Sequence, residues 1–323
     1  MKKVGVLGSF VWDVIHGRDV RTLPVEEWGG ITYALAAFDA ALPDNWQIVP
    51  ISKVGHDRAR QAREFLTSLR HLAPGTGAIE VDARTNQVEL RYANAERRTE
   101  TLSGGVPMWT WPALQPLLQG LDALYINLIS GFELDVETAQ LIRQHFKGPI
   151  YGDLHSLMLA IQPDGLRTLR PLPNASEWCA CVDVVQVNED EMTMMASDPL
   201  SLAATAIARG VQQLVVTLGS RGLVYVNAPG FERVTDRATW QRLAGVGGTI
   251  ATALVPPPAR AVKTEGDPTG CGDVFGATYY SRLLAGDMFS QALHVALSAA
   301  VRNVDFRGAR GLAAYLRGEL IAQ

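Results

Sequence analysis

The fold is decided by the stretch from Asp183 to Leu218, which contains two apolar runs, Asp183-Val184-Val185-Gln186-Val187 and Leu214-Val215-Val216-Thr217-Leu218. Between them, Ser201–Arg209 repeats its apolar residues with the period of a helix. Two nearly continuous apolar strands joined by an amphipathic helix are typical of parallel strands that helices cover on both faces. The stretch therefore predicts an α/β fold around a mainly parallel sheet.

The same alternation extends in both directions along the chain. Ligands of such sheets bind beyond the carboxyl ends of the strands. Asp153, Leu154 and His155 come at the end of one predicted strand, so they could lie at that edge. We interpret His155 as a structural histidine with a hydrogen bond near the strand end, and an acid–base or metal-binding group is the alternative. The other predicted strands are Val4–Leu7, Gln47–Val54, Ala123–Leu128 and Pro149–Leu154, and the other predicted helices are Ile31–Ala41, Arg58–Leu69 and Val136–Phe146.

Two segments break this alternation. Gln87–Tyr92 and Arg97–Leu102 alternate apolar and polar residues around the turn at residues 93–96, which predicts a hairpin with one solvated face that projects as a flap. Residues 227–260 are rich in glycine and include three successive prolines, so we interpret them as an irregular surface excursion. We expect residues 1–323 to form a single domain.

Composition narrows the class of protein. The chain is 47% hydrophobic and 19% charged, with a formal net charge of −4, so it has no overall attraction to nucleic acid or to an anionic membrane. Since no window approaches 18 uncharged apolar residues, we expect no membrane span. Three cysteines are too few for a disulfide framework, which predicts reduced thiols and a cytoplasmic protein.

The segment that carries the chemistry is Gly266-Asp267-Pro268-Thr269-Gly270-Cys271-Gly272-Asp273-Val274-Phe275-Gly276-Ala277. Its glycines precede a predicted helix, Val274–Leu284, so backbone N–H groups and the positive helix end can hold a developing negative charge. Asp273 falls in the first helical turn, where a carboxylate can accept a hydroxyl proton during phosphoryl transfer. A glycine-rich loop with a helix-capping acid is the alternative.

This segment resembles the D-T-x-G-A-G-D signature of the ribokinase-like, or PfkB, family of carbohydrate and nucleoside kinases, from which Pro268 and Cys271 depart. The resemblance implies a ribokinase-like three-layer α/β/α sandwich with a mainly parallel central sheet and a small β lid formed from about residues 13–30 and 85–105. It also implies an ATP-dependent kinase that transfers a γ-phosphoryl group to a hydroxyl of a small sugar-like acceptor. Asp273 would be the base, and the anion hole would be the backbone of Gly270, Cys271 and Gly272.

Other motifs resemble the same family, in the same order. The resemblance implies acceptor binding near the N-terminus, Mg²⁺ and phosphate organised through water by an N-x-x-E motif, a T-x-G-x-x-G turn beside the nucleotide, and a helix and loop, Ala296–Gly308, beside the adenine. It further implies a K⁺ site near the glycine loop. The residues are Asp13, Gly29 and Gly30 for the acceptor; Asn188, Glu191, Thr217, Gly219, Gly222 and Asn303 for the nucleotide, with Glu191 also at Mg²⁺; and Asp267 and Thr269 for K⁺.

One departure concerns the acceptor. Many family members have an asparagine four residues after the glycine pair, whereas this chain has Ala34. The departure weakens the case for a simple hexose or ribose and strengthens that for a cyclitol, a nucleoside or an unusual sugar. A nucleoside kinase and a catalytically silent metabolite-binding protein remain the alternatives. Because an exposed strand edge invites pairing, we also expect a homodimer through the lid.

Overall fold

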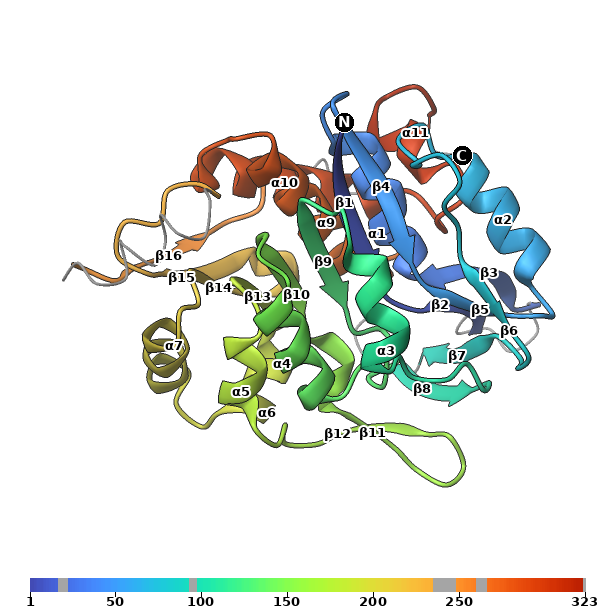
Figure 1. Cartoon of the computed structure of the whole chain (residues 1–323), viewed down its shortest axis with the longest axis horizontal. Coiled ribbons are helices and arrows are strands. Elements are labelled where there is room, and N and C mark those ends of the chain that lie inside the picture. The colour runs from blue at the N-terminus through green and yellow to red at the C-terminus, as the bar shows by residue number, and fades with distance from the viewer. Residues whose placement is uncertain (17–22, 93–97, 235–247, 260–265, 322–323) are drawn as a thin grey trace.

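The computed structural model describes residues 1–16, 23–92, 98–234, 248–259 and 266–321. At its centre lies an eight-stranded sheet, labelled in Figure 1, with the strand order β16-β15-β14-β13-β10-β9-β1-β4. In chain order, its strands are β1 (Lys2–Leu7), β4 (Trp46–Ile51), β9 (Ala123–Asn127), β10 (Ile150–Asp153), β13 (Val184–Asn188), β14 (Gln213–Thr217), β15 (Leu223–Asn227) and β16 (Ala251–Val255).

Six neighbouring strands, from β4 to β14, pair in parallel, and β15 and β16 continue the sheet in antiparallel pairing. Every residue of β9 and β10 is buried, as expected for central strands that are covered on both faces. The predicted mainly parallel sheet is therefore confirmed. Its parallel strands bring the carboxyl ends of β9, β10, β13 and β14 to one edge.

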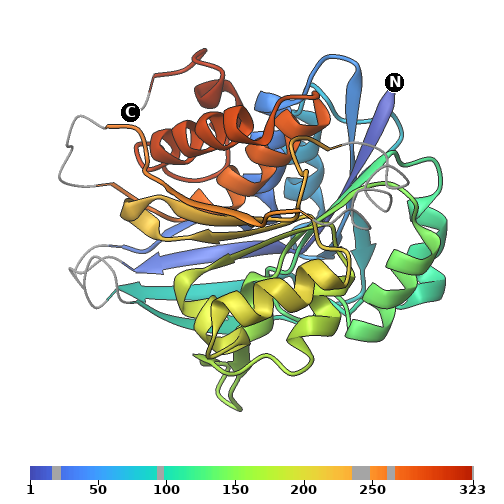
Figure 2. The same ribbon diagram turned by 90° about the vertical axis from the view of Figure 1, so that its left-hand side faces the viewer.

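Helices cover both faces of this sheet, as the edge-on view in Figure 2 shows. On one face, α1, α2, α9, α10 and α11 enclose one hydrophobic cluster, and on the other face, α3 to α7 enclose a second cluster. This arrangement confirms the predicted three-layer sandwich. The helices are α1 (Ile31–Ala41), α2 (Ala59–Thr67), α3 (Trp111–Leu114), α4 (Val136–His145), α5 (Ala175–Ala180), α6 (Glu189–Met195), α7 (Pro199–Ala208), α9 (Cys271–Leu284), α10 (Phe289–Asn303) and α11 (Leu312–Leu316).

A second sheet of four strands, called the small sheet below, lies beside the main one (Figure 1). Its order is β3-β2-β7-β8, and β7 and β8 pair antiparallel, which confirms the predicted hairpin. The turn predicted at residues 93–96 lies outside the described residues. The strands of the small sheet are β2 (Phe10–His16), β3 (Val25–Gly30), β7 (Asn86–Tyr92) and β8 (Arg98–Ser103).

A short hairpin contacts the edge of the small sheet. It consists of β11 (Leu159–Ile161) and β12 (Arg167–Leu169), which pair antiparallel. Its tip joins β8, because the N–H of Leu102 donates to the carbonyl of Gly165 at 2.9 Å and Leu166 forms a bridge with Thr101. The two strands of this hairpin were not among the elements predicted from the sequence.

Two predicted segments were wrong. Gln47–Val54 is not one strand, because the chain leaves the main sheet after Ile51, and β5 (Lys53–Gly55) pairs instead with β6 (Ile79–Val81). Residues 227–260 are not simply a surface excursion, because β16 lies within them and completes the main sheet beside β15.

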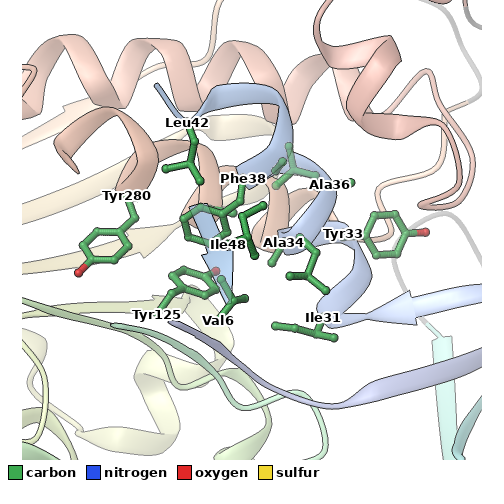
Figure 3. Close-up of a cluster of buried hydrophobic side chains, with 14 of the residues drawn as sticks. Val6, Ile31, Tyr33, Ala34, Ala36, Phe38, Leu42, Ile48, Tyr125 and Tyr280 are labelled. Carbon is green, nitrogen blue, oxygen red and sulfur yellow. The ribbon is translucent and has the colours of Figure 1, made fainter. Parts of the chain in front are cut away.

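The core anchors α1 against the main sheet (Figure 3). Phe38 of α1 meets Tyr125 of β9 edge to face, with ring centroids 5.1 Å apart. Tyr33 lies at the edge of the cluster, and its hydroxyl points away from the other labelled side chains. The N-terminus of α1 is thereby fixed relative to the sheet. Within the described residues, the model contains no helix of the length and hydrophobicity that crossing a membrane requires.

Candidate active site

The glycine-rich segment forms the start of α9, which begins at Cys271 rather than at the predicted Val274. Gly270 is the N-cap in the left-handed conformation, with φ of 75°, and a Cβ there would lie 2.3 Å from the ring of Tyr33. Only glycine meets both constraints without strain. Asp273 occupies the first turn, where the amide of Asn127 donates to its Oδ1 at 2.5 Å. Asp273 is therefore held at the positive end of a helix.

The backbone of this turn differs from the predicted anion hole in one respect. The N–H of Cys271 donates to the carbonyl of Pro268 at 3.1 Å, so it closes the turn. Gly272 is exposed at the helix start, and its carbonyl accepts a hydrogen bond from Gln186 Nε2 at 3.1 Å. The first N–H groups of a helix lack partners within the helix. An anion site here would therefore use Gly272 and the helix end, not Cys271.

The predicted acceptor residues lie together where β2, β3 and α1 meet. Asp13 is buried on β2, and a Cβ on Gly29 would stand only 1.8 Å from its Oδ2. Gly30 has φ of 58° and directly precedes α1. A Cβ on Gly30 would press against the carbonyl of Ser9 at 2.8 Å. The glycine pair thus lets the Asp13 carboxylate pack closely against bare backbone.

Tyr33 connects the acceptor residues with the glycine loop. Its ring packs on Gly270, and its pKa is raised well above the usual value, first by burial and then by the carboxylates of Glu27, Asp13, Asp267 and Asp273. Because Gly29 packs on Asp13 just before α1, and Tyr33 of α1 packs on Gly270, the start of α1 lies between the predicted acceptor carboxylate Asp13 and the loop that leads to the predicted base Asp273.

The predicted nucleotide residues lie at the ends of β13 and β14. Asn188 and Thr217 pair directly across these strands. Asn188 caps α6 with Glu191 in a capping box: Asn188 Oδ1 accepts from the N–H of Glu191 at 2.9 Å, and Glu191 Oε2 accepts from the N–H of Asn188 at 2.7 Å. Gly219 and Gly222, with φ of 58° and 93°, form the tight turn into β15. Space is open around Gly219, whereas Gly222 packs against the backbone of β16.

Two ionisable groups from the end of β10 join this edge. The imidazole of His155 contacts the carboxylate of Glu191. Burial favours neutral His155, but the charges of Glu191, Asp153 and Glu100 raise its pKa to about 9. Burial raises the pKa of Asp153 to about 8, with His155 opposing the shift and Glu191 and Asp273 adding to it. His155 is therefore hydrogen-bonded near the end of the strand, as the structural interpretation of this histidine predicted.

Asn303 supports the glycine loop in this structure. It is fully buried, and its amide donates to the carbonyl of Thr269 at 2.9 Å. This burial is at odds with the direct nucleotide contact expected from the sequence. Asp267 accepts a hydrogen bond from the N–H of Thr269 at 2.9 Å, so the two predicted K⁺ residues do lie together.

The donor set fits a magnesium ion that substrate phosphates and water hold. Among the described residues, no group of three or more histidine, cysteine or acidic side chains is arranged to bind a metal ion by itself. Mg²⁺ ordinarily keeps several waters and is bound through one or two carboxylates together with phosphates. Glu191 already accepts hydrogen bonds from Asn188, which suits contact with the ion through water.

Sequence reasoning missed Asn127 and Gln186. Asn127 ends β9 and is fully buried, and Gln186 lies within β13, where its Nε2 also donates to Asp153 at 2.9 Å. Both are polar residues inside or at the end of an apolar strand, a pattern that could have identified them as candidates for the ligand edge. The pattern does not identify the residue that each one contacts, because Asp273 is 146 positions away from Asn127.

Comparisons with known proteins identify the family of the chain. Residues 74–313 match the model of the pfkB family carbohydrate kinases. A comparison with curated sequences finds no significant match.

Many solved structures share the fold, and three of them are described here. One is a pyrophosphate-dependent myo-inositol-1 kinase converted into a myo-inositol-3 kinase (14% identity, 98% of each chain covered, TM-score 0.71). Another is the Burkholderia thailandensis nucleoside kinase with inosine (17% identity, 98% of this chain and 95% of that chain, TM-score 0.68). The third is ribokinase from Cryptococcus neoformans var. grubii serotype A with ADP (16% identity, 99% of each chain, TM-score 0.64).

Proposed function

Because this chain belongs to the pfkB family of carbohydrate kinases, we propose that it transfers the γ-phosphoryl group of ATP to a hydroxyl of a small sugar or sugar-like acceptor. The observation that carries the proposal is the position of Asp273. Its carboxylate lies in the first turn of α9, held by Asn127, just after the glycine loop on which Tyr33 packs.

In the proposed reaction, Asp273 accepts the proton of the acceptor hydroxyl while the oxygen of that hydroxyl attacks the γ-phosphorus. The bond between that phosphorus and the β,γ-bridging oxygen breaks, and ADP leaves with the electron pair. The helix end and the Gly272 N–H stabilise the charge on the transferring group. Asp13, Gly29 and Gly30 orient the acceptor, and the small sheet acts as a lid that excludes water.

We place the donor and the ions at the edge of the main sheet where its parallel strands have their carboxyl ends. Asn188, Thr217 and Gly219 would contact the nucleotide phosphates, and Glu191 would hold Mg²⁺ through water. When bound, Mg²⁺ neutralises phosphate charge. Asp267 and Thr269 would form the K⁺ site. Since one structural neighbour is described as pyrophosphate-dependent and another was solved with ADP, ATP and pyrophosphate are to be compared as donors.

The test is product formation with each donor, Mg²⁺ and a panel of sugars, cyclitols and nucleosides, with Asp273→Asn as the variant. We expect one acceptor class to stimulate turnover and the variant to lose about 10²–10⁴-fold in kcat, the range of general base catalysis. Calorimetry should show that the variant still binds ATP. Undiminished turnover by Asp273→Asn would refute its role as the base.

Two alternatives have distinct outcomes in the same panel. A nucleoside kinase would respond to inosine or adenosine and not to cyclitols. A catalytically silent protein would bind an acceptor or ATP without forming product. The presence of Asp273 with its supporting Asn127 favours catalysis over a silent site.

A homodimer through the lid stays a prediction. One edge of the small sheet, β8, is already hydrogen-bonded to the β11–β12 hairpin through Leu102 and Gly165. Strand pairing with a second copy would therefore use the opposite edge, β3. Sedimentation measurements would give the oligomeric state.

A further inference from the structure

The β11–β12 hairpin carries one cation to the acceptor side of the site. Arg167 begins β12, and its side chain is only 3% exposed. Its NH2 donates to the carbonyl of Ile129 at 3.1 Å. Ile129 in turn lies against the glycine pair, since a Cβ on Gly30 would stand 3.0 Å from Ile129 Cγ2. Ile129 thus lies between the guanidinium of Arg167 and Gly30, which belongs to the proposed acceptor site.

The small sheet brings a carboxylate to the same place. Glu100 of β8 pairs across the sheet with Leu90, and Leu90 pairs with Ile15 of β2, two positions beyond Asp13. Paired residues share a face, and so do residues two apart on a strand. Glu100 therefore lies on the same face of the small sheet as Asp13. Its Oε2 is 3.5 Å from NH1 of Arg167, so hairpin and sheet meet at this ion pair.

The charge on this face of the small sheet indicates what kind of acceptor the site favours. Glu27 pairs with Asp13 across β3 and β2, so Glu27, Asp13 and Glu100 lie on one face of the small sheet. Burial raises the pKa of Glu27 to about 7, with Arg307 opposing the shift, so the negative charge of this face comes mainly from Asp13 and Glu100. Arg167 is balanced by Glu100. A phosphorylated acceptor would bring negative charge towards these carboxylates, whereas a neutral polyol would bring hydroxyl groups that both donate and accept hydrogen bonds.

We propose that Arg167 and Glu100 select the acceptor by binding adjacent hydroxyl groups of a neutral polyol. The guanidinium donates a hydrogen bond to one hydroxyl oxygen, and the carboxylate accepts one from the neighbouring hydroxyl. This proposal rests on the proposed function, because it concerns the acceptor of that reaction. The hairpin adds a structural element to acceptor recognition, since its tip is bonded to β8 at Leu102.

The experiment measures acceptor binding by calorimetry without any donor. The probes are myo-inositol, its deoxy analogues, ribose, inosine and fructose 6-phosphate, and the variants are Arg167→Met and Glu100→Gln. We expect the wild type to bind a neutral polyol and each variant to bind it about 10- to 100-fold more weakly, as for loss of a hydrogen bond to a charged group. Removing the recognised hydroxyl from the probe should weaken wild-type binding similarly and have little further effect in the variants.

Matched controls separate recognition from folding. Arg170→Met changes an exposed arginine that follows the same hairpin, and Glu89→Gln changes a carboxylate on the opposite face of the small sheet. Both should bind the polyol as the wild type does, and all variants should bind ATP equally.

The outcomes distinguish this proposal from the proposed function. The proposal would be overturned if fructose 6-phosphate bound more tightly than the neutral probes, or if no polyol bound. It would also be overturned if both variants bound the polyol as the wild type does, or if they lost affinity equally for all ligands including ATP. A wild type that binds the polyol but transfers no phosphoryl group would contradict the proposed function instead.

Discussion

At Gly270, backbone conformation and side-chain packing impose separate demands on one residue. Its φ of 75° disfavours any residue with a Cβ, and the ring of Tyr33 occupies the space that a Cβ would need. Gly286, just after the C-terminus of the same helix, has φ of 95° with no atom within 4 Å of its ideal Cβ. Both glycines therefore have a positive φ that disfavours other residues, but only Gly270 also leaves no space for a Cβ.

We predict that Gly286→Ala lowers the free energy of unfolding by about 1 kcal/mol and leaves kcat unchanged. Gly270→Ala should cost more, because Tyr33 or the loop must move, and it should also lower kcat by displacing Asp273. Urea unfolding and steady-state kinetics measure both effects. Equal stability losses with unchanged kcat in both variants would contradict the role assigned to the Tyr33 contact.

The buried carboxyl group of Asp153 should make the thermal stability of the protein depend on pH. Its pKa is raised to about 8 in the folded protein, from 3.8 for an ordinary aspartate, mainly because it is buried. Over this interval the folded protein keeps a proton that the unfolded chain has lost, so the stability that Asp153 contributes decreases as the pH rises. We expect Asp153→Asn to flatten the decline of Tm between pH of about 5 and about 8. Circular dichroism melts would show it, and parallel pH profiles would contradict the shift.

At the scale of single elements, the capping box of α6 combines a structural and a proposed binding role. Asn188 caps α6, and Asp135 caps α4 in the same way by accepting from the N–H of Thr138 at 2.7 Å. We predict that Asn188→Ala and Asp135→Ala each lower the free energy of unfolding by about 1 kcal/mol. Only Asn188→Ala should also raise the KM for the donor and the Mg²⁺ concentration needed for half-maximal rate. Equal kinetics in both variants would limit Asn188 to capping.

The elements that the sequence predicted are those with a strong local pattern. Ile31–Ala41 was predicted with the observed bounds. Five of the six parallel strands were recovered because each is a nearly continuous apolar run, whereas the predicted strand Gln47–Val54 ran past the end of β4 into β5. The strands β11 and β12 have only three residues each, which is too short for alternation to show. Their position depends on β8, which is distant in the chain. The ion pair of Arg167 with Glu100 could not be predicted for the same reason.

Some residues of the candidate site could likewise be predicted from the sequence and others could not. Asp273 and Gly270 were predictable because the chemistry lies within one segment. Asn127 and Gln186 contact the start of α9 only through the order of strands in the sheet, which the sequence did not specify. Cys271 was assigned to the anion hole from its place in the motif, but the hydrogen bond of its N–H depends on how the loop turns.

At the scale of the whole molecule, a buried ion pair joins the layer of α4 to the central sheet. Arg143 of α4 donates to Asp183, just before β13, at 2.8 Å, and both side chains are less than 10% exposed. We predict that Arg143→Met lowers the free energy of unfolding by about 3–5 kcal/mol, because it leaves a buried carboxylate without its counter-charge.

Two further variants test this interpretation by urea unfolding. Arg143→Met combined with Asp183→Asn should recover part of the loss, because the buried charge is removed together with its partner. Arg60→Met, which breaks an exposed pair with Glu64, should change stability by less than about 0.5 kcal/mol. A double variant no more stable than Arg143→Met would mean that packing, not charge, causes the loss.

The contact between Gly165 and Leu102 also makes the hairpin tip a place from which movement of the small sheet could be observed. Burial raises the pKa of the Cys179 and Cys181 thiols to about 12, so both react slowly with thiol reagents near neutral pH. In a Cys271→Ala background, Pro163→Cys would offer one exposed thiol two residues from Gly165. A dye attached there would change its emission if the tip moves, so a fluorescence titration with acceptor would test the proposed closure of the lid directly in solution.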